Sequence, residues 1–265
     1  ALPILTVVVD GSNAVGGIVA PSILEALGCA VIPLNCVIDP DFPNHDPDPG
    51  VDNNLEQLYN EVLEHGADLG IALDGDADRI VAISAKGELV RPDRLLMLLA
   101  KDVLAANPGS AVVFDIKSSS QLAAVISDAG GVPTLSRTGH GFMQERMLES
   151  SAPIGAEFSG HVFFRDRWFG FDDGIYAAAR LIELLSNAEQ DLDEMLATLP
   201  QSFSTPEILV PVADSAKETI IARLLEEARF EGATLNTLDG LRADFDDGWG
   251  LIRASNTSAA LTLRF

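Results

Sequence analysis

The first part of the chain alternates short apolar runs with amphipathic segments. The apolar runs predict strands buried on both faces of a sheet, and they are Leu5–Val9, Ala30–Leu34 and Leu69–Leu73. Between them, Ile18–Leu27 and Leu55–Glu64 have helical spacing, and each precedes a glycine suited to end a helix. Ile80–Ser84 and Glu88–Val90 flank a Lys-Gly turn and predict a hairpin. The alternation of strands and helices predicts a mostly parallel sheet.

From Asp93 the same order of elements begins again. A helix, a strand, a second helix and a second strand are predicted at Leu95–Ala105, Val112–Asp115, Gln121–Ser127 and Val132–Leu135. The two stretches align strand, helix, glycine stop and strand, so we interpret them as a duplicated α/β unit. In each copy a third short strand, Gly70–Leu73 or Gly155–Phe158, leads into a loop of small and chargeable residues. Such loops bind ligands in open α/β sheets.

After Pro200 the pattern becomes α+β. A strand at Ile208–Val212 and a helix at Ala216–Phe230 precede short strands that alternate with turns from Thr234 onward, typical of an antiparallel meander. We therefore predict two duplicated mixed-sheet α/β domains, 1–90 and 91–200, followed by a partial α+β domain with an antiparallel sheet at 201–265. The chain begins and ends within strand-like patterns, which favours a fragment of a longer protein.

Composition and charge narrow the class of protein. The 265 residues are 47% hydrophobic, enough for a sizeable core, which excludes a disordered tail or a small disulfide-stapled scaffold. A formal charge of −23 disfavours nucleic acid and anionic membranes as partners. Cys29 and Cys36 match no zinc motif, and no apolar run reaches the roughly 18 residues of a membrane span. These features predict a cytoplasmic protein.

Three carboxylates follow the predicted strand Leu69–Leu73. Asp74, Asp76 and Asp78 repel one another at this spacing, and a bound cation would explain them. Oxygen ligands alone favour Mg²⁺ or Ca²⁺ over zinc, and an EF-hand is excluded because its glycine and glutamate positions hold Arg79 and Ala85. Arg79 suggests an anchor for a phosphate bridged to the metal. The alternative is a solvated acidic turn.

Two further groups of polar residues fall at predicted strand ends. Glu157, Ser159 and His161 alternate along an expected extended segment, which would place all three on one side as a grip for sugar hydroxyls. A surface strand would produce the same pattern. Lys117 and His140 also follow predicted strands, and a solvated lysine and a loop histidine are the alternatives for these two.

The loop 253–258 and the placement of basic residues both indicate an anionic ligand. Residues Arg253, Ser255, Asn256 and Thr257 offer many hydrogen-bond donors and no carboxylate. The chain has only 17 Lys and Arg. Six of them lie in or beside the loops named above, namely Arg79, Lys117, Arg137, Arg165, Arg167 and Arg253. We therefore expect a small anionic ligand. The segment Arg165–Gly174 contains two arginines and three aromatic residues and precedes a predicted helix, which Asp172 or Asp173 is expected to cap.

Several motifs occur in the order found in one enzyme family. They are Asp-Gly-Asp-Ala-Asp-Arg, Thr-Gly-His, Ala-Glu-Phe-Ser-Gly-His, Arg-Trp-Phe-Gly-Phe-Asp-Asp-Gly and Arg-Ala-Ser-Asn-Thr. With them the chain resembles the α-D-phosphohexomutase superfamily, in particular its bacterial phosphomannomutase/phosphoglucomutase group, over essentially all 265 residues. Members have four domains around a central cleft, and this chain resembles domains two, three and most of four.

The resemblance implies a role for each matching residue. The implied Mg²⁺ ligands are Asp74, Asp76 and Asp78. The implied catalytic residues are Arg79, Lys117 and His140. The implied substrate-binding residues are Glu157, Ser159, His161, Arg253, Ser255, Asn256 and Thr257. The implied activity is reversible phosphoryl transfer between C1 and C6 of mannose or glucose phosphate through a hexose bisphosphate.

The sequence also departs from the family pattern. Ala77 replaces a glycine between two metal carboxylates, Ala156 and Phe158 replace Gly and Met around Glu157, and Ala259 stands at a usual proline. The family's phosphoserine motif, Ser-His-Asn-Pro, is absent from the sequence, so we expect the chain alone to be inactive without the phosphoserine domain as partner. The alternative is a sugar-phosphate binding or regulatory protein. A dinucleotide-dependent oxidoreductase is disfavoured because the first turn lacks G-x-G-x-x-G.

Overall fold

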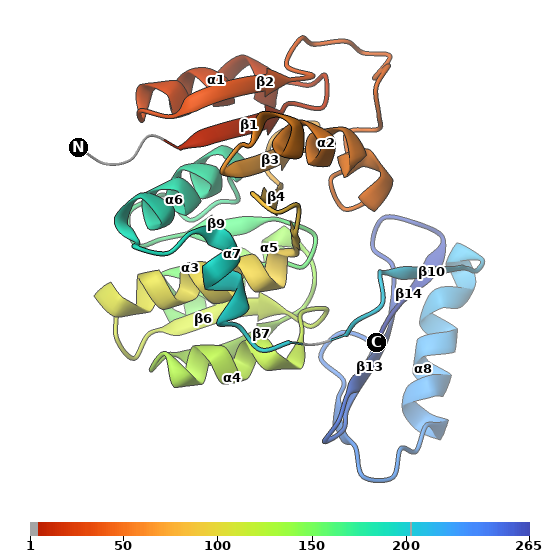
Figure 1. Cartoon of the computed structure of the whole chain (residues 1–265). Helices are drawn as coiled ribbons and strands as arrows, with labels where there is room; N and C mark the ends of the chain where they lie inside the picture. Colours follow the sequence, from red (N-terminus) through yellow and green to blue (C-terminus); the bar gives the residue numbers. More distant parts are fainter. Residues whose placement is uncertain (1–4, 202) are drawn as a thin grey trace.

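The chain forms three units that follow one another in sequence (Figure 1). This computed structural model describes residues 5–201 and 203–265, so the first four residues of the predicted first domain and Ser202 of the third lie outside the described residues. The first two units are α/β layers packed together, and the third lies beside the second at the end of a connecting segment. Within the described residues, no helix is long and apolar enough to cross a membrane.

The first unit is a mixed sheet with helices on both faces. Its strands are β1 (Thr6–Asp10), β2 (Ala30–Leu34), β3 (Leu69–Leu73), β4 (Ile80–Ser84) and β5 (Leu89–Val90). Its helices are α1 (Gly16–Ala26), a 3-10 turn (Asp52–Leu55) and α2 (Glu56–His65). The order is β2-β1-β3-β4-β5. Strands β2, β1 and β3 are parallel, β4 is antiparallel to β3, and β5 is antiparallel to β4. Side chains of β1 alternate between two cores, Val7 and Val9 on the α1 side and Val8 on the α2 side.

The second unit repeats this arrangement. Its elements are α3 (Pro92–Ala106), β6 (Ala111–Asp115), α4 (Ser120–Asp128), β7 (Val132–Ser136), α5 (His140–Ser150), β8 (Ile154–Ala156), β9 (Val162–Phe164), α6 (Gly174–Asn187) and α7 (Leu192–Ala197). The strand order β7-β6-β8-β9 has the same directions as β2-β1-β3-β4, which confirms the duplicated unit. One continuous core extends through both units, because α3 and α6 contact both sheets.

The third unit is an antiparallel sheet with one helix. Its elements are β10 (Ile208–Pro211), a 3-10 turn (Asp214–Ala216), α8 (Lys217–Glu227), β11 (Thr234–Asn236), β12 (Leu241–Asp244), β13 (Trp249–Ala254) and β14 (Ala260–Arg264). The strand order is β10-β14-β13-β12-β11. This sheet confirms the predicted α+β unit.

Two buried arginines attach the third unit to the second. Arg242 donates hydrogen bonds to the carbonyl oxygens of Ile116 and Ser118, both at 2.7 Å. Arg264 donates to the carbonyl oxygen of Lys117, and its guanidinium lies over the ring of Phe158, 3.4 Å from the centroid. We call these two side chains the arginine clasp. They hold the loop that follows β6.

The structure shortens one predicted strand, adds a helix that the sequence did not predict, and identifies the helix that follows the Asp172-Asp173 pair. The strand predicted at Gly155–Phe158 ends at Ala156, because the chain turns at Glu157. Helix α5 was not expected, since few of its positions carry buried apolar side chains, chiefly Met143 and Met147. The helix predicted after the Asp172-Asp173 pair is α6, and Asp173 is its cap, accepting a hydrogen bond from the Tyr176 amide at 2.9 Å.

Candidate functional site

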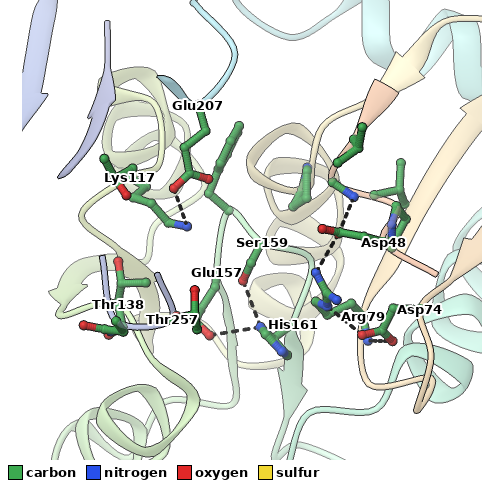
Figure 2. Close-up of a pocket in the computed structure, with 18 of the residues that line it drawn as sticks. Asp48, Asp74, Arg79, Lys117, Thr138, Glu157, Ser159, His161, Glu207 and Thr257 are labelled. Carbon is green, nitrogen blue, oxygen red and sulfur yellow. Dashed lines mark hydrogen bonds and ion pairs between the residues drawn. The ribbon is translucent and has the colours of Figure 1, made fainter. Parts of the chain in front are cut away.

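The three units meet around a cavity of about 1070 Å³, which we call the central cavity (Figure 2). The loops after β3, β6, β7 and β8 reach it because the carboxyl ends of these parallel strands open to the same side. The loop between β13 and β14 closes it from the third unit. All thirteen residues proposed from the sequence line it: Asp74, Asp76, Asp78, Arg79, Lys117, His140, Glu157, Ser159, His161, Arg253, Ser255, Asn256 and Thr257.

The aspartate loop after β3 presents three carboxylates to the cavity. One carboxylate oxygen from each of Asp74, Asp76 and Asp78 lies within 4.8 Å of the others. Asp74 is buried, and burial raises its pKa although the neighbouring Arg79 guanidinium opposes the shift. Ala77 has a φ of +64°, the left-handed conformation that a glycine would adopt without strain.

The residues of this loop fit a hard divalent cation. The Oδ1 atom of Asp78 is buried and makes no hydrogen bond, and its nearest basic group is His161 Nε2 at 3.4 Å. A buried carboxylate oxygen without a hydrogen bond is costly, and a metal ion would compensate that cost. The donor set contains only carboxylate oxygens, which suits Mg²⁺ or Ca²⁺ better than zinc.

Arg79 is held between two carboxylates (Figure 2). Its Nε donates to Asp74 Oδ2 at 2.6 Å, and its Nη1 donates to Asp48 Oδ1 at 2.9 Å. Burial disfavours the charged guanidinium, but Asp74 and Asp48 outweigh that effect and raise the pKa of Arg79. Sequence reasoning missed Asp48. The only available signal was its place in the Asp- and Pro-rich segment 39–49, to which no element was assigned.

Glu157, Ser159 and His161 converge, but not for the predicted reason. The segment is a tight turn between β8 and β9, in which the Gly160 amide donates to the Glu157 carbonyl oxygen at 3.1 Å, so the expected extended conformation is wrong. The Nδ1 of His161 lies 2.8 Å from Ser159 Oγ and 3.1 Å from Glu157 Oε2. The turn therefore brings the three side chains together through the imidazole of His161.

Carboxylates surround His161. Burial alone would lower its pKa, but Asp78 and Glu157 outweigh burial and raise the pKa to about 9, so the ring carries a positive charge near neutral pH. Asp172 Oδ2 is buried without a hydrogen bond and lies 3.9 Å from His161 and 3.6 Å from His140 Nδ1. The side chain of His140 itself is exposed at the cavity wall.

Lys117 is almost fully buried and points to the third unit. Its Nζ lies 3.5 Å from Oε1 of Glu207 (Figure 2). Glu207 directly precedes β10, and the sequence analysis did not single it out. The arginine clasp holds the backbone on either side of Lys117, so its ammonium is fixed both by its own loop and by the third unit.

The loop 255–259, which we call the β13–β14 loop, is tied to the loop after β7. Asp239 bridges the two, since its Oδ2 accepts from Arg253 Nε and from the Thr138 amide, both at 3.0 Å. Asn256 Nδ2 donates to the Thr138 carbonyl oxygen at 3.1 Å. Arg253 is buried, and its Nη2 has no hydrogen-bond partner. This unpartnered donor beside a cavity suits an anionic group.

Three of the basic residues expected near the ligand lie elsewhere. Arg167 pairs with Glu183 on α6, Arg165 donates to the Met147 carbonyl oxygen, and Arg137 lies over the ring of Phe142. These three therefore do not line the central cavity, whereas Arg79, Lys117 and Arg253 do. Arg91, which pairs with Asp52 at 2.8 Å, lines the central cavity and was not foreseen.

Comparison with known proteins gives the same three units. Family models match residues 3–87, 91–203 and 207–265, and they describe the α/β/α domain II, the α/β/α domain III and the C-terminal domain of phosphoglucomutase/phosphomannomutase.

Individual relatives agree with these matches. A phosphomannomutase/phosphoglucomutase of Pseudomonas aeruginosa is 49% identical over 261 residues, which are 98% of this chain and 56% of that protein. A phosphoglucomutase of Neisseria gonorrhoeae is 46% identical over 263 residues, 98% of this chain and 57% of that protein. A crystal structure of a phosphoglucomutase/phosphomannomutase family protein from Burkholderia thailandensis is similar with a TM-score of 0.93 and 41% identity, covering 99% of this chain and 56% of that one. The chain thus spans little more than half the length of these relatives.

Proposed function

Because the chain belongs to the phosphoglucomutase/phosphomannomutase family of the α-D-phosphohexomutase superfamily, we propose that its central cavity serves reversible phosphoryl transfer between C1 and C6 of glucose or mannose phosphate. The reaction would pass through a hexose bisphosphate. In this proposal the chain supplies the metal, sugar and phosphate sites, and a phosphoserine on a further domain supplies the phosphoryl group. We place the reaction in the cytoplasm, as the sequence predicts.

One observation carries the proposal. Three motifs of different chemistry, the aspartate loop, the turn 157–161 and the β13–β14 loop, lie in separate units of the chain and line the same cavity. A hexose phosphate has matching parts, namely a reacting end, hydroxyl groups and a second end that carries phosphate. Phosphoryl transfer depends on positioning and charge neutralisation, which such a cavity can supply.

At the reacting end, Asp74, Asp76 and Asp78 would hold Mg²⁺, which as a Lewis acid supplies charge stabilisation to the transferring phosphoryl group. Arg79 would add its own positive charge, directed by Asp74 and Asp48. Lys117 and His140 are the cavity residues available for phosphate contact or proton transfer.

At the other end, the unpartnered Nη2 of Arg253 and the exposed side chains of Asn256 and Thr257 would bind the phosphate that does not react. Glu157 and Ser159 lie between the two ends and would contact the sugar hydroxyls, with His161 holding both in place. Binding energy at the distant phosphate would then orient the reacting end.

The test is binding and turnover by the 265-residue chain. We expect glucose 1-phosphate to bind in the presence of MgCl₂, measured by isothermal titration calorimetry, and to lose at least about tenfold in affinity in EDTA, a difference of about 1.4 kcal/mol. We expect negligible mutase turnover, because the phosphoserine motif is absent from this sequence. Robust turnover by the chain alone, or affinity indifferent to Mg²⁺, would contradict the proposal.

A pair of variants localises the metal effect. Asp76 is exposed in the aspartate loop, and Asp128 is also exposed, at the end of α4, and does not line the cavity. Asp76→Asn should remove the Mg²⁺ dependence of glucose 1-phosphate binding, because it deletes one anionic ligand. Asp128→Asn makes the same chemical change and should leave that dependence intact. Equal behaviour of the two variants would argue against a metal site in this loop.

A further inference from the structure

The buried carboxylate of Asp115 is a common hydrogen-bond acceptor for three loops. Asp115 is the last residue of β6, is 0% exposed and does not itself line the central cavity. Its Oδ1 accepts from Ser118 Oγ at 2.9 Å and from the Phe158 amide at 3.0 Å. Its Oδ2 accepts from Thr138 Oγ1 at 3.0 Å. These donors belong to the loops after β6, β8 and β7, respectively.

The three donors lie in or beside the proposed sugar-phosphate site. Ser118 and Phe158 directly follow two cavity-lining residues, Lys117 and Glu157. Thr138 lines the cavity itself, and its carbonyl oxygen accepts a hydrogen bond from the β13–β14 loop. Lys117, Thr138 and Glu157 lie on the same side of the cavity (Figure 2). The buried carboxylate therefore lies behind this wall and joins its three loops to one another.

Stability alone does not account for a carboxylate at this position. Burial disfavours its charged form and raises the pKa of Asp115, although nearby Lys117 opposes the shift. A well-packed apolar side chain would avoid the cost of burying a charge. Such a side chain could not accept hydrogen bonds from three loops, so the loops explain the carboxylate.

The first unit contains the same arrangement. Asp10 is the last residue of β1, the strand that corresponds to β6 in the duplicated unit, and it is also 0% exposed. Its Oδ1 accepts from the Ser12 amide at 2.9 Å and from Asn35 Nδ2 at 3.2 Å, and its Oδ2 lies 3.0 Å from His45 Nε2. These partners lie in the loops after β1 and β2, and the second loop also carries Asp48 of the central cavity. A buried aspartate thus joins cavity loops at the same strand end in both units.

We infer that Asp115 is a positioning residue, whose carboxylate sets the relative placement of the loops after β6, β7 and β8 and thereby the affinity of the cavity for a hexose phosphate. The loops require its hydrogen-bond acceptors rather than its charge. The statement on affinity rests on the proposed function, whereas the statement on the loops stands without it.

Two substitutions separate hydrogen bonding from charge. Asp115→Ala removes all three hydrogen bonds. Asp115→Asn removes the charge but can keep the bonds, since its amide oxygen can accept from Ser118 and Phe158 while its amide nitrogen donates to the Thr138 hydroxyl. In calorimetry with MgCl₂, glucose 1-phosphate should bind Asp115→Ala at least about tenfold more weakly than the wild type, and Asp115→Asn within about threefold of it. Equal losses in the two variants would assign the effect to charge and overturn the inference.

Asp193 provides the matched control. It is also buried, accepts from Ser84 Oγ at 2.6 Å and from the Lys86 amide at 3.3 Å, and does not line the central cavity. Asp193→Ala should lower the free energy of unfolding, as Asp115→Ala does, but leave glucose 1-phosphate affinity within about twofold of the wild type. An equal loss of affinity in both alanine variants would show that affinity follows stability, and would overturn the inference.

Amide hydrogen exchange tests the placement of the loops without a ligand. Read by mass spectrometry, exchange in segments 116–119, 137–139 and 157–161 should be at least about fivefold faster in Asp115→Ala than in the wild type or Asp193→Ala. Unchanged exchange would overturn the inference whether or not glucose 1-phosphate binds. Faster exchange, combined with a wild type that does not bind glucose 1-phosphate, would support the placement of the loops and contradict only the proposed function.

A milder pair of variants serves if Asp115→Ala does not fold. Thr138→Val removes only the hydroxyl that donates to Asp115, and Thr138→Ser keeps that hydroxyl. Exchange in segment 137–139 should be faster in Thr138→Val than in Thr138→Ser, and glucose 1-phosphate should bind Thr138→Val at least about threefold more weakly. Equal exchange in these two variants would overturn the inference.

Discussion

At the scale of single residues, Ala77 shows how the aspartate loop tolerates a departure from the family pattern. A residue with a side chain at a φ of +64° carries strain of about 1 kcal/mol, which a glycine would not. The methyl group is buried in the core beside Gly16, and burying a methyl contributes about 0.8 kcal/mol. The two effects are of similar size and opposite sign, which explains why alanine can stand between the proposed metal ligands.

A smaller and a larger residue at position 77 should therefore have unequal effects on the free energy of unfolding. Ala77→Gly should change the free energy of unfolding by less than about 1 kcal/mol, because strain relief offsets the lost burial and the freer unfolded chain. Ala77→Val should destabilise by about 2 kcal/mol or more, since a β-branched side chain is strained at positive φ and crowds Gly16. Urea denaturation of both variants measures this, and equal effects would contradict the account.

Because the pKa of His161 is raised, we expect the stability of the metal-free protein to depend on pH. Its pKa of about 9 exceeds the ordinary value of about 6.5, so its charged form stabilises the fold fully below pH 6.5, and the contribution is lost as the pH rises to 9. The difference between these two pKa values corresponds to about 3 kcal/mol in the free energy of unfolding. In EDTA, the unfolding free energy of the wild type should exceed that of His161→Gln most below pH 6.5, and the gap should narrow towards pH 9. A gap that widens with pH would contradict the assigned charge.

At the scale of elements, α6 depends on a side-chain cap. Asp173 accepts the Tyr176 amide at the start of α6, and this helix contacts both sheets. Asp173→Ala should lower the free energy of unfolding by about 1 kcal/mol in urea, the usual effect of losing an N-cap. Glu189→Ala removes an exposed carboxylate just after the same helix and should change stability by less than about 0.5 kcal/mol. Equal losses in the two variants would exclude capping as the cause.

The turn 157–161 is the element that the sequence described wrongly. Alternating polar residues predict an extended strand, but Gly160 has a φ of +108°, and its ideal Cβ would lie 3.0 Å from the Ile80 carbonyl oxygen. That close approach of the start of β4 favours a tight turn over a strand. The three side chains still lie together, as predicted, because His161 contacts both Ser159 and Glu157.

At the scale of the whole molecule, the arginine clasp decides how the third unit faces the cavity. Arg264 lies 3.5 Å from Asp93 of α3, and both side chains are almost fully buried. The loop it holds contains Lys117, and the sheet it belongs to carries the β13–β14 loop. The clasp therefore connects the two ends of the proposed sugar-phosphate site.

Arg264→Met should affect both stability and binding. It leaves Asp93 buried without its cation, which costs about 3 to 5 kcal/mol in urea denaturation. Glucose 1-phosphate affinity, measured by calorimetry with Mg²⁺, should fall at least about tenfold because the β13–β14 loop loses its position. Arg223→Met breaks an exposed pair with Glu227 on α8 and should change neither quantity appreciably. Unchanged affinity in Arg264→Met would show that the arginine clasp does not position the β13–β14 loop at the central cavity.

The sequence by itself determined the order of the elements, the duplication and the candidate residues, because periodicity and local motifs are written along the chain. Strands such as Ala30–Leu34 and Leu69–Leu73 were predicted to the residue. The domain boundaries and the roles of the site residues stay predictions. Only the tertiary structure decided that Asp48 reaches Arg79 and that Glu207 reaches Lys117, contacts that join residues 31 and 90 positions apart. Such contacts depend on how the loops and units pack, and no local pattern encodes that packing.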